Sequence, residues 1–481
     1  MSSPGTSIPP SGSEDPVRAS AAVAARLDRL PASWQVWRMV LLLSLGGVFE
    51  FYDLFFTGYV APGMVKSGLF SPASLGWLAS LKAIAVAGVG IFIFATFAGL
   101  WVGTLLVSPI ADRLGRRKAF TGALLWYAVC TAIMAFAQSG LWLNIWRFIA
   151  GIGLGIELVT IDAYIAELVP KTVRGRAFSV NQTITYAVVP LIAFLAWKLV
   201  PIAPLGFDGW RWVVLIGSSG ALLVWFLLLG IPESPRWLLK HGRHAEAECI
   251  VARLEAAVAA RGDPLPEPLP EGGDARDRDQ GSLSEAFRPP YRARTLMLSV
   301  FNFFQTIGFY GFAAWVPTLL IHRGIHVTAS LEYAFIIAIA NPFGPLIGTL
   351  FSDRIERKWQ IVLAAFAMLV LIGVFAVLSA PAVLIALGVL FTLFSNVMSY
   401  AFHNYQAELF PTRFRARAIG FVYSWSRLSA AFAGLAIGYL LHSGGVPAVA
   451  VFIGFAMLMV MGSIALFGPR TRGRALEEIS P

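Results

Sequence analysis

Apolar runs of about twenty residues recur along the whole chain, and they constrain its fold more than any other feature. A helix of that length crosses the roughly 30 Å hydrocarbon core of a bilayer. Charged residues make up only 13% of the 481 residues, against 57% hydrophobic ones, and they gather in brief clusters between the runs. Because a water-soluble protein of this size needs a charged surface, the composition predicts a membrane protein.

Six of these runs precede a long polar segment and six follow it, so we expect twelve transmembrane helices. The runs lie near residues 38–62, 84–108, 118–138, 141–165, 176–200, 210–231, 295–320, 329–351, 359–380, 381–406, 417–441 and 446–468. The expected organisation is an N-terminal tail over 1–37, a six-helix bundle over 38–231, a central loop with a short helix over 232–294, a second six-helix bundle over 295–468 and a C-terminal tail over 469–481.

Two short charged motifs each occur twice, and the two copies are separated by the same distance along the chain. ADRLGRRK carries Asp112 and its later copy, SDRIERK, carries Asp353, while AELVPKTVRGRA and AELFPTRFRARA begin at Ala166 and Ala407. One offset shared by two independent pairs indicates an internal repeat. We therefore predict an all-α membrane protein whose two six-helix bundles are pseudo-symmetric. Repeated halves with a substrate path between them are typical of secondary transporters.

Lys and Arg residues collect in alternate loops and predict the orientation of the chain. They crowd the loops between runs 2 and 3, 4 and 5, 8 and 9, and 10 and 11, whereas the opposite loops carry scattered charges such as Lys66 and Arg323. Positive loops stay on the cytoplasmic side, so we expect these loops, the central loop and both termini to be cytoplasmic in a bacterial inner (plasma) membrane.

The net charge of +10 would suggest a nucleic-acid partner in a soluble protein. In a membrane protein the topology explains these positive residues better, so we expect the lipid bilayer as a partner and no nucleic acid. Cys130 and Cys249 have no spacing that indicates a metal site, and no Ser/His/Asp signature stands out. We therefore expect no cofactor, no metal and no enzymatic activity.

Several of these motifs resemble signatures of the major facilitator superfamily. SPIADRLGRRKAF resembles the 2–3 loop signature, and TLFSDRIERKW resembles the same signature more weakly. WRFIAGIGLGIE, from Trp146, is similar to the fourth-helix motif, and PESPRWLLKHGR, from Pro232, is similar to the end-of-helix-six signature of the sugar-porter branch. The resemblance implies the superfamily fold, with twelve helices in two six-helix bundles, and solute transport.

The substrate branch is indicated by shorter segments. FEFYDLFFTGY, from Phe49, and ARLDRLP before it are similar to segments of metabolite:proton symporters and of bacterial carriers of nicotinate-like organic acids. Familiar sugar porters carry a glutamine cluster in helix seven, where this chain has only Asn302 and Gln305. The Gly-Pro-x-x-Gly-Gly motif of drug:proton antiporters is replaced in helix five by TITYAVVPLIAF. These departures favour organic-acid import over sugar uptake and drug efflux.

Ionisable residues inside the apolar runs are the main candidates for coupling, because a charge in hydrocarbon needs a partner or a water-filled cavity. Glu50 and Asp53 are three residues apart on helix one, and Arg147 lies in helix four, followed by Glu157 and Asp162. We predict Asp53 as the proton-carrying acid with Arg147 as its partner, and Glu50 as the alternative acid. A static pair that fixes helix packing is the open alternative.

Arg427 in helix eleven is the candidate anion ligand, because a guanidinium can bind a carboxylate through two hydrogen bonds. Nearby aromatic residues could stack on a flat ring. An ion pair with Glu408 is the alternative role for Arg427, and His403 is a weaker candidate. The predicted substrate-binding set is Arg427, Tyr423, Tyr310, Gln305, Asn302 and Asn404.

The loop motifs supply candidate gating residues, since charges at helix ends can hold the two bundles together on one side. Such contacts must form and break, so each should be as weak as a surface ion pair. The alternative is that these residues only set topology. The predicted gating set is Asp112, Arg113, Arg116, Glu167, Arg174, Asp353, Arg354, Glu408 and Arg415.

Together these features predict a proton-coupled symporter that imports a small organic anion, with aromatic acids among the candidates. The expected partners are the substrate, the proton and lipid, and the expected state is a monomer. A sugar or polyol porter and a non-transporting sensor with the carrier fold are the alternatives.

Overall fold

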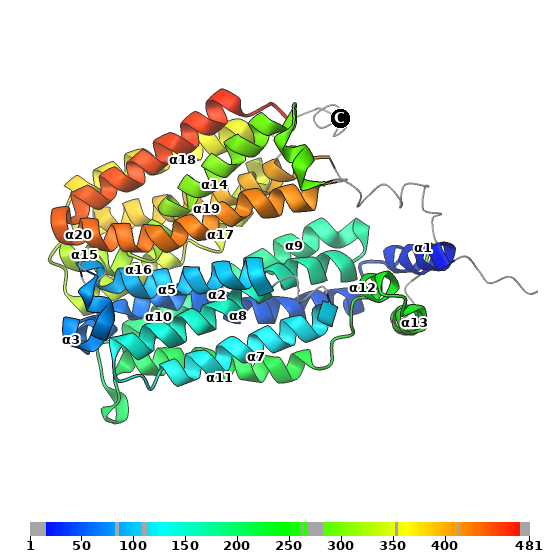
Figure 1. The fold of residues 1–481 in the computed structure, drawn as a ribbon, viewed down its shortest axis with the longest axis horizontal. Coiled ribbons are helices and arrows are strands. Elements are labelled where there is room, and N and C mark those ends of the chain that lie inside the picture. Colours follow the sequence, from blue (N-terminus) through cyan, green and yellow to red (C-terminus); the bar gives the residue numbers. More distant parts are fainter. Residues whose placement is uncertain are drawn as a thin grey trace, which may run out of the picture.

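The computed structural model describes residues 16–81, 86–107, 113–261, 264–267, 282–351, 355–411 and 414–471. Helices account for every regular element in these ranges, and none of these residues forms a strand. Figure 1 shows two stacked groups of long helices whose axes run in roughly the same direction. The all-α fold class predicted from the sequence is therefore confirmed.

The first half of the chain supplies six membrane-spanning elements. They are α2 (Trp34–Lys66), α5 (Val89–Val102) with the π-helical η2 (Gly103–Val107), α7 (Arg116–Met134), α8 (Gly140–Leu168), α9 (Lys171–Tyr186) with α10 (Val188–Leu199), and α11 (Gly209–Leu228). Short pieces join or precede them: α1 (Pro16–Asp28), α3 (Pro72–Leu75), η1 (Gly76–Ser80) and η3 (Pro204–Gly206).

The second half repeats this arrangement after a central segment that contains α12 (Pro235–Lys240), α13 (His244–Ala259) and η4 (Leu283–Phe287). Its elements are α14 (Tyr291–Ala313) with α15 (Val316–His322), α16 (Val327–Ala338) with α17 (Phe343–Phe351), α18 (Arg357–Val377), α19 (Pro381–Glu408) and α20 (Arg415–Phe467).

Twelve spans follow from these elements. Among the described residues, nine helices are long and apolar enough to cross a membrane. One of them, α20, bends at Gly445, where φ is 64°, and therefore provides two spans. The shorter apolar helix α5 and the 19-residue α7 complete the count.

Small residues allow α8 and α5 to pack closely against each other. A Cβ atom on Gly155 would lie 2.2 Å from the backbone oxygen of Leu100, and one on Gly99 would lie 2.2 Å from the backbone oxygen of Phe148. Any larger residue would separate the helices. The GIGLG segment is thus a helix-packing surface, as its position inside an apolar run predicts.

The two halves pack tightly at the end of the molecule that carries α3, α10 and α15 (Figure 1). A Cβ atom on Gly438 would meet the backbone oxygen of Ala87 at 2.2 Å. Nearby, Trp197 of the first half stacks on Phe335 of the second, with ring centroids 5.8 Å apart. This end is sealed by backbone contact and aromatic packing.

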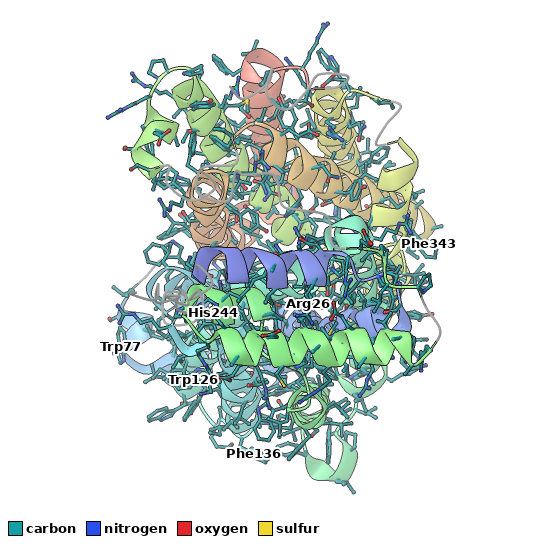
Figure 2. The ribbon with its side chains drawn as sticks, turned by 90° about the vertical axis from the view of Figure 1, so that its right-hand side faces the viewer. Arg26, Trp77, Trp126, Phe136, His244 and Phe343 are labelled. Atoms are coloured by element: carbon teal, nitrogen blue, oxygen red, sulfur yellow. The ribbon has the colours of Figure 1, made fainter. Side chains whose placement is uncertain are left out.

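The other end, which we call the basic end, carries the short Lys/Arg-rich loops and the helices α1, α12 and α13. Figure 2 views the molecule from this end, with α1 and α13 lying across the first half and Arg26 between them. The ion pairs that described residues of this end make with one another stay within the first half and the central segment, or within the second half. These pairs hold each half together and do not bridge the two halves.

Candidate functional site

The first part of the site is an ion pair buried inside the first half. Arg147 of α8 donates from Nη1 to Oδ2 of Asp53 in α2, and from Nη2 to the Asp53 backbone oxygen, both at 2.6 Å. Arg147 has no exposed surface and Asp53 is 3% exposed. The residues predicted to pair are therefore in contact, and a charge pair so far from water is the kind of group that marks function in a membrane protein.

Hydroxyl groups accept two further hydrogen bonds from Arg147 and fix the guanidinium. Its Nε donates to Thr96 of α5 at 2.7 Å, and its Nη2 donates to Thr57 of α2 at 2.8 Å. On the other side of the pair, the Thr131 hydroxyl of α7 donates to Oδ1 of Asp53 at 3.0 Å. The carboxylate thus accepts hydrogen bonds on both oxygens, an arrangement that suits its ionised form.

The second part of the site spans the two halves. Arg427 of α20 is 3% exposed, and its charge interacts with the carboxyl groups of Glu50 and Asp162 from the first half. Glu50 is buried and its Oε1 has no hydrogen-bond partner among the described residues, whereas Asp162 is exposed. Asp162 lies on the stretch of α8 nearer the basic end, so the exposed member of this charged set is on that side.

Tyrosines of the second half hold the Arg427 guanidinium. Its Nη2 donates to the Tyr423 hydroxyl at 3.2 Å, and its carbon lies 4.8 Å from the Tyr423 ring centre. The Tyr310 hydroxyl also interacts with it. The Nε of Arg427 has no partner among the described residues, so the guanidinium keeps a donor available.

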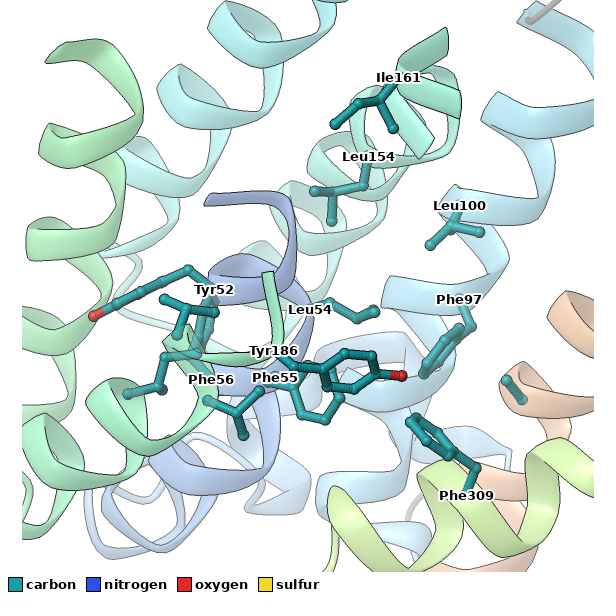
Figure 3. Close-up of a cluster of buried hydrophobic side chains, with 14 of the residues drawn as sticks. Tyr52, Leu54, Phe55, Phe56, Phe97, Leu100, Leu154, Ile161, Tyr186 and Phe309 are labelled. Atoms are coloured by element: carbon teal, nitrogen blue, oxygen red, sulfur yellow. The ribbon is translucent and has the colours of Figure 1, made fainter. Parts of the chain in front are cut away.

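Aromatic rings from both halves meet in one cluster (Figure 3), and Tyr310, which interacts with Arg427, contacts two of them. Phe55 of α2 lies 6.4 Å from Phe309 and 6.2 Å from Tyr310, both of α14. Phe97 of α5 lies 4.7 Å from Tyr310, and Tyr186 of α9 is labelled in the same cluster. A flat apolar ligand next to Arg427 would meet ring faces and edges.

The other predicted substrate ligands bond within their own helices. The amide of Asn302 donates to the backbone oxygen of Leu298 and that of Asn404 to the backbone oxygen of Tyr400, each one helical turn earlier. The Asn302 Oδ1 has no partner among the described residues, and Gln305 is 9% exposed. Their place in the substrate set stays a prediction.

Three of the predicted gating residues, Arg116, Glu167 and Glu408, take part in two matching pairs at the basic end, and the fourth member, Arg357, was not predicted. Arg116 and Glu167 lie 2.9 Å apart between α7 and α8, and Arg357 pairs with Glu408 between α18 and α19. The alternative role given to Arg427, an ion pair with Glu408, is wrong, because Glu408 bonds to Arg357.

The remaining gating candidates lie apart from those pairs. Arg174 contacts Asp28 of the N-terminal segment, at 4.0 Å, and Arg415 donates to the Phe410 backbone oxygen. Arg113 is exposed. The remaining three predicted gating residues, Asp112, Asp353 and Arg354, lie outside the described residues.

Some residues of the site were not assigned a role from the sequence. Thr57, Thr96 and Thr131 read as ordinary helix residues, and only the fold reveals that their hydroxyls meet the ion pair. The available signal for Asp162 was a carboxylate inside an apolar run, the same signal that identified Asp53.

A recess of about 150 Å³, lined by Lys66 and Trp210 among others, lies at the sealed end, away from these charges.

Comparison with known proteins agrees with this arrangement. The family described as "Sugar (and other) transporter" matches residues 39–481. The putative metabolite transport protein YyaJ of Bacillus subtilis is 29% identical over 94% of this chain and 96% of its own length. The niacin transporter NiaP of Acinetobacter baylyi is 26% identical over 95% of this chain and 99% of its own.

A solved structure shares the fold. The crystal structure of a D-xylose-proton symporter superposes with a TM-score of 0.71, covering 92% of this chain and 99% of that one, at 20% sequence identity. At that identity the match speaks for the fold alone. It supports the two-bundle architecture in which the charged groups described above sit.

Proposed function

Since the chain belongs to the sugar (and other) transporter family, which matches residues 39–481, we propose that it imports a small organic anion together with a proton. It is a multi-pass membrane transporter and not an enzyme. In this proposal the basic end faces the cytoplasm of the inner membrane, both termini lie on that side, and the protein works as a monomer.

The buried pair of Asp53 and Arg147 is the observation that carries proton coupling. With the proton absent, the carboxylate is held by Arg147 and Thr131. A proton on Asp53 would cancel the charge attraction and free Arg147, and α2 and α8 could then shift relative to each other. A buried pair broken on one side leaves an uncompensated charge, so the two protonation states should favour different packings of the first half.

Arg427 supports an anionic substrate. It is a buried positive group whose charge acts on carboxyl groups of the first half, and aromatic rings from α2, α5 and α14 cluster around Tyr310 beside it. Niacin, named as the substrate of one relative, is a carboxylate on an aromatic ring, and it would match both features. A substrate that bridges Arg427 and the first half would contact both bundles and could change how they pack together.

The state of the structure fits a transporter open toward the basic end. The sealed end is closed by contacts such as Gly438 with Ala87, while Asp162 and His403 are exposed on helices that face the interface. In the proposed cycle the Arg116–Glu167 and Arg357–Glu408 pairs strengthen each half and set how it closes. Asp112, Asp353 and Arg354 belong to the same proposed gates.

Reconstitution into liposomes tests the proposal. With a pH gradient imposed, acid outside, the protein should accumulate radiolabelled nicotinate or benzoate, and unlabelled carboxylates should compete whereas xylose and glucose should not. Accumulation of the sugars instead would favour the sugar-porter alternative. Absence of flux for both classes, with binding retained, would favour the sensor alternative.

A further inference from the structure

Glu157 is a buried carboxyl that the coupling scheme above leaves unused. It lies on α8 with no exposed surface, and neither of its side-chain oxygens has a hydrogen-bond partner among the described residues. An unpaired charge inside a membrane-embedded bundle is strongly unfavourable. This environment favours the protonated form of Glu157.

Within the described part of the chain, the titratable groups whose charges act on Glu157 are all acidic. They are the Tyr127 hydroxyl of α7 and the carboxyls of Glu50 and Asp53 of α2. The hydroxyl of Tyr127 is buried and also lacks a partner that meets hydrogen-bond geometry among the described residues. Gly153, one turn before Glu157, brings the two helices together, since a Cβ atom there would lie 3.2 Å from the Tyr127 Cβ.

Tyr127, Glu157 and Glu50 all lie on the basic-end side of the Asp53–Arg147 pair. The Thr131 hydroxyl donates to Asp53 at 3.0 Å, and Tyr127 lies one helical turn before Thr131 on the same face of α7. Glu157 follows Arg147 by ten residues on α8, about 15 Å along the axis. Glu50 lies one turn before Asp53 on α2, and its charge interacts with Arg427 and with the exposed Asp162.

We propose that Tyr127 and Glu157 are a proton relay between Asp53 and the interface site around Glu50. The inference rests on the proton symport proposed above. Chains of carboxyl and hydroxyl groups inside membrane helices are a known means of moving protons. Asp53 is only 3% exposed, and its two carboxylate oxygens accept hydrogen bonds from Thr131 and Arg147.

In this relay one proton moves from Asp53 to Glu50 in steps. Glu157 gives its proton to the Glu50 carboxylate and becomes ionised. Tyr127 then gives its hydroxyl proton to Glu157 and takes the proton that leaves Asp53. At the end Asp53 is ionised beside Arg147, Tyr127 and Glu157 are protonated as before, and one proton has reached Glu50. In this end state Asp53 is ionised and Glu157 is protonated, as described above for the two residues.

A substrate-free measurement tests the relay. The purified protein in liposomes is subjected to a rapid pH rise, and the infrared C=O band of protonated carboxyl groups is followed in time. Glu157→Gln keeps a neutral side chain of the same size, so it should fold normally, yet it should slow deprotonation of Asp53 by about tenfold or more, because a positioned acid–base group is lost. Tyr127→Phe should slow it similarly. Thr160→Val is the matched control on α8, since the Thr160 hydroxyl bonds only to Ile156 of its own helix.

The outcomes separate the relay from the symport proposal. The band lost in Asp53→Asn identifies the Asp53 signal. Slow release in both Glu157→Gln and Tyr127→Phe, with Thr160→Val like the wild type, supports the relay. Rates in Glu157→Gln equal to those of the control overturn it and make Glu157 a packing residue. If Asp53→Asn removes no titrating band at all, the proton-symport proposal itself fails at Asp53.

Discussion

Arg147 reaches both the side-chain Oδ2 and the backbone oxygen of Asp53, at 2.6 Å each. One guanidinium therefore contacts the charged carboxylate and also fixes the backbone of α2 at that turn. Phe56 and Phe92 cover the guanidinium, with ring centres 4.7 and 5.2 Å away. A change in the protonation of Asp53 would thus also change the hydrogen bond that Arg147 makes to the backbone of α2.

Replacing Arg147 by Lys should disable coupling while keeping a positive charge. A single ammonium cannot reach Asp53, Thr57 and Thr96 together, because it lacks the planar fork of the guanidinium. We expect the rate of proton-driven uptake to fall by about tenfold or more, with substrate affinity changed little. Arg147→Ala should instead destabilise the fold by about 3–5 kcal/mol, since it leaves Asp53 uncompensated. Thermal unfolding in detergent distinguishes the two effects.

Replacing Arg427 by Lys should weaken binding of the anion. The bidentate contact with a carboxylate would be lost, so we expect the KM for nicotinate to rise by about tenfold or more, equivalent to roughly 1.4 kcal/mol or more. Arg211→Lys is the matched control, because Arg211 is also a buried arginine but donates to the backbone oxygens of Ala135 and Ala137 at the sealed end. An equal rise in KM in both variants would remove Arg427 from the substrate site.

Protonation of Glu255 should loosen the packing of α1 against α13 at low pH. Burial raises the pKa of Glu255, but hydrogen bonds from Arg26 and Arg29 outweigh that effect and leave it below its usual value of 4.5. Because this pKa is lowered in the folded state, the pair stabilises the packing above about pH 4.5, and the stabilisation is lost as the pH falls through the folded-state value.

The size of that effect is small, since the side chains of both arginines are partly exposed. We expect Glu255→Gln to cost about 1 kcal/mol or less at neutral pH and to flatten the acid side of the stability profile. Proteolysis of the N-terminal segment as a function of pH measures it. Glu246→Gln is the control, because the partner of Glu246 among the described residues is its exposed neighbour Arg243. Equal acid sensitivity of the wild type and Glu255→Gln would contradict the assignment.

The twelve-helix fold could be predicted because hydrocarbon leaves a chain few choices. Every backbone group must be satisfied within a helix, so apolar runs of sufficient length become spans. The break of the eighth span at Asn341 and Pro342, between α16 and α17, also follows from local chemistry. Asp53 and Arg147 could be paired from the sequence because each needs a partner in the same hydrocarbon.

Other contacts could not be predicted, because they depend on how the helices rotate and approach one another. Each residue turns the helix face by about 100°, so Glu50 and Asp53, three residues apart, can face different neighbours. Asp53 points into the first half, while Glu50 interacts with Arg427 across the interface. Glu408 was a plausible partner for Arg427 in sequence terms, yet it lies at the end of α19 beside Arg357.

Uptake into liposomes by the Asp53→Asn variant tests the central claim most directly. Asparagine is close in size and can still accept a hydrogen bond from Arg147, but it cannot carry a proton. With labelled nicotinate and an imposed pH gradient, we predict that Asp53→Asn abolishes uphill uptake and the accompanying entry of protons, while exchange of internal for external nicotinate continues. Uphill uptake at the wild-type rate in this variant would contradict the account.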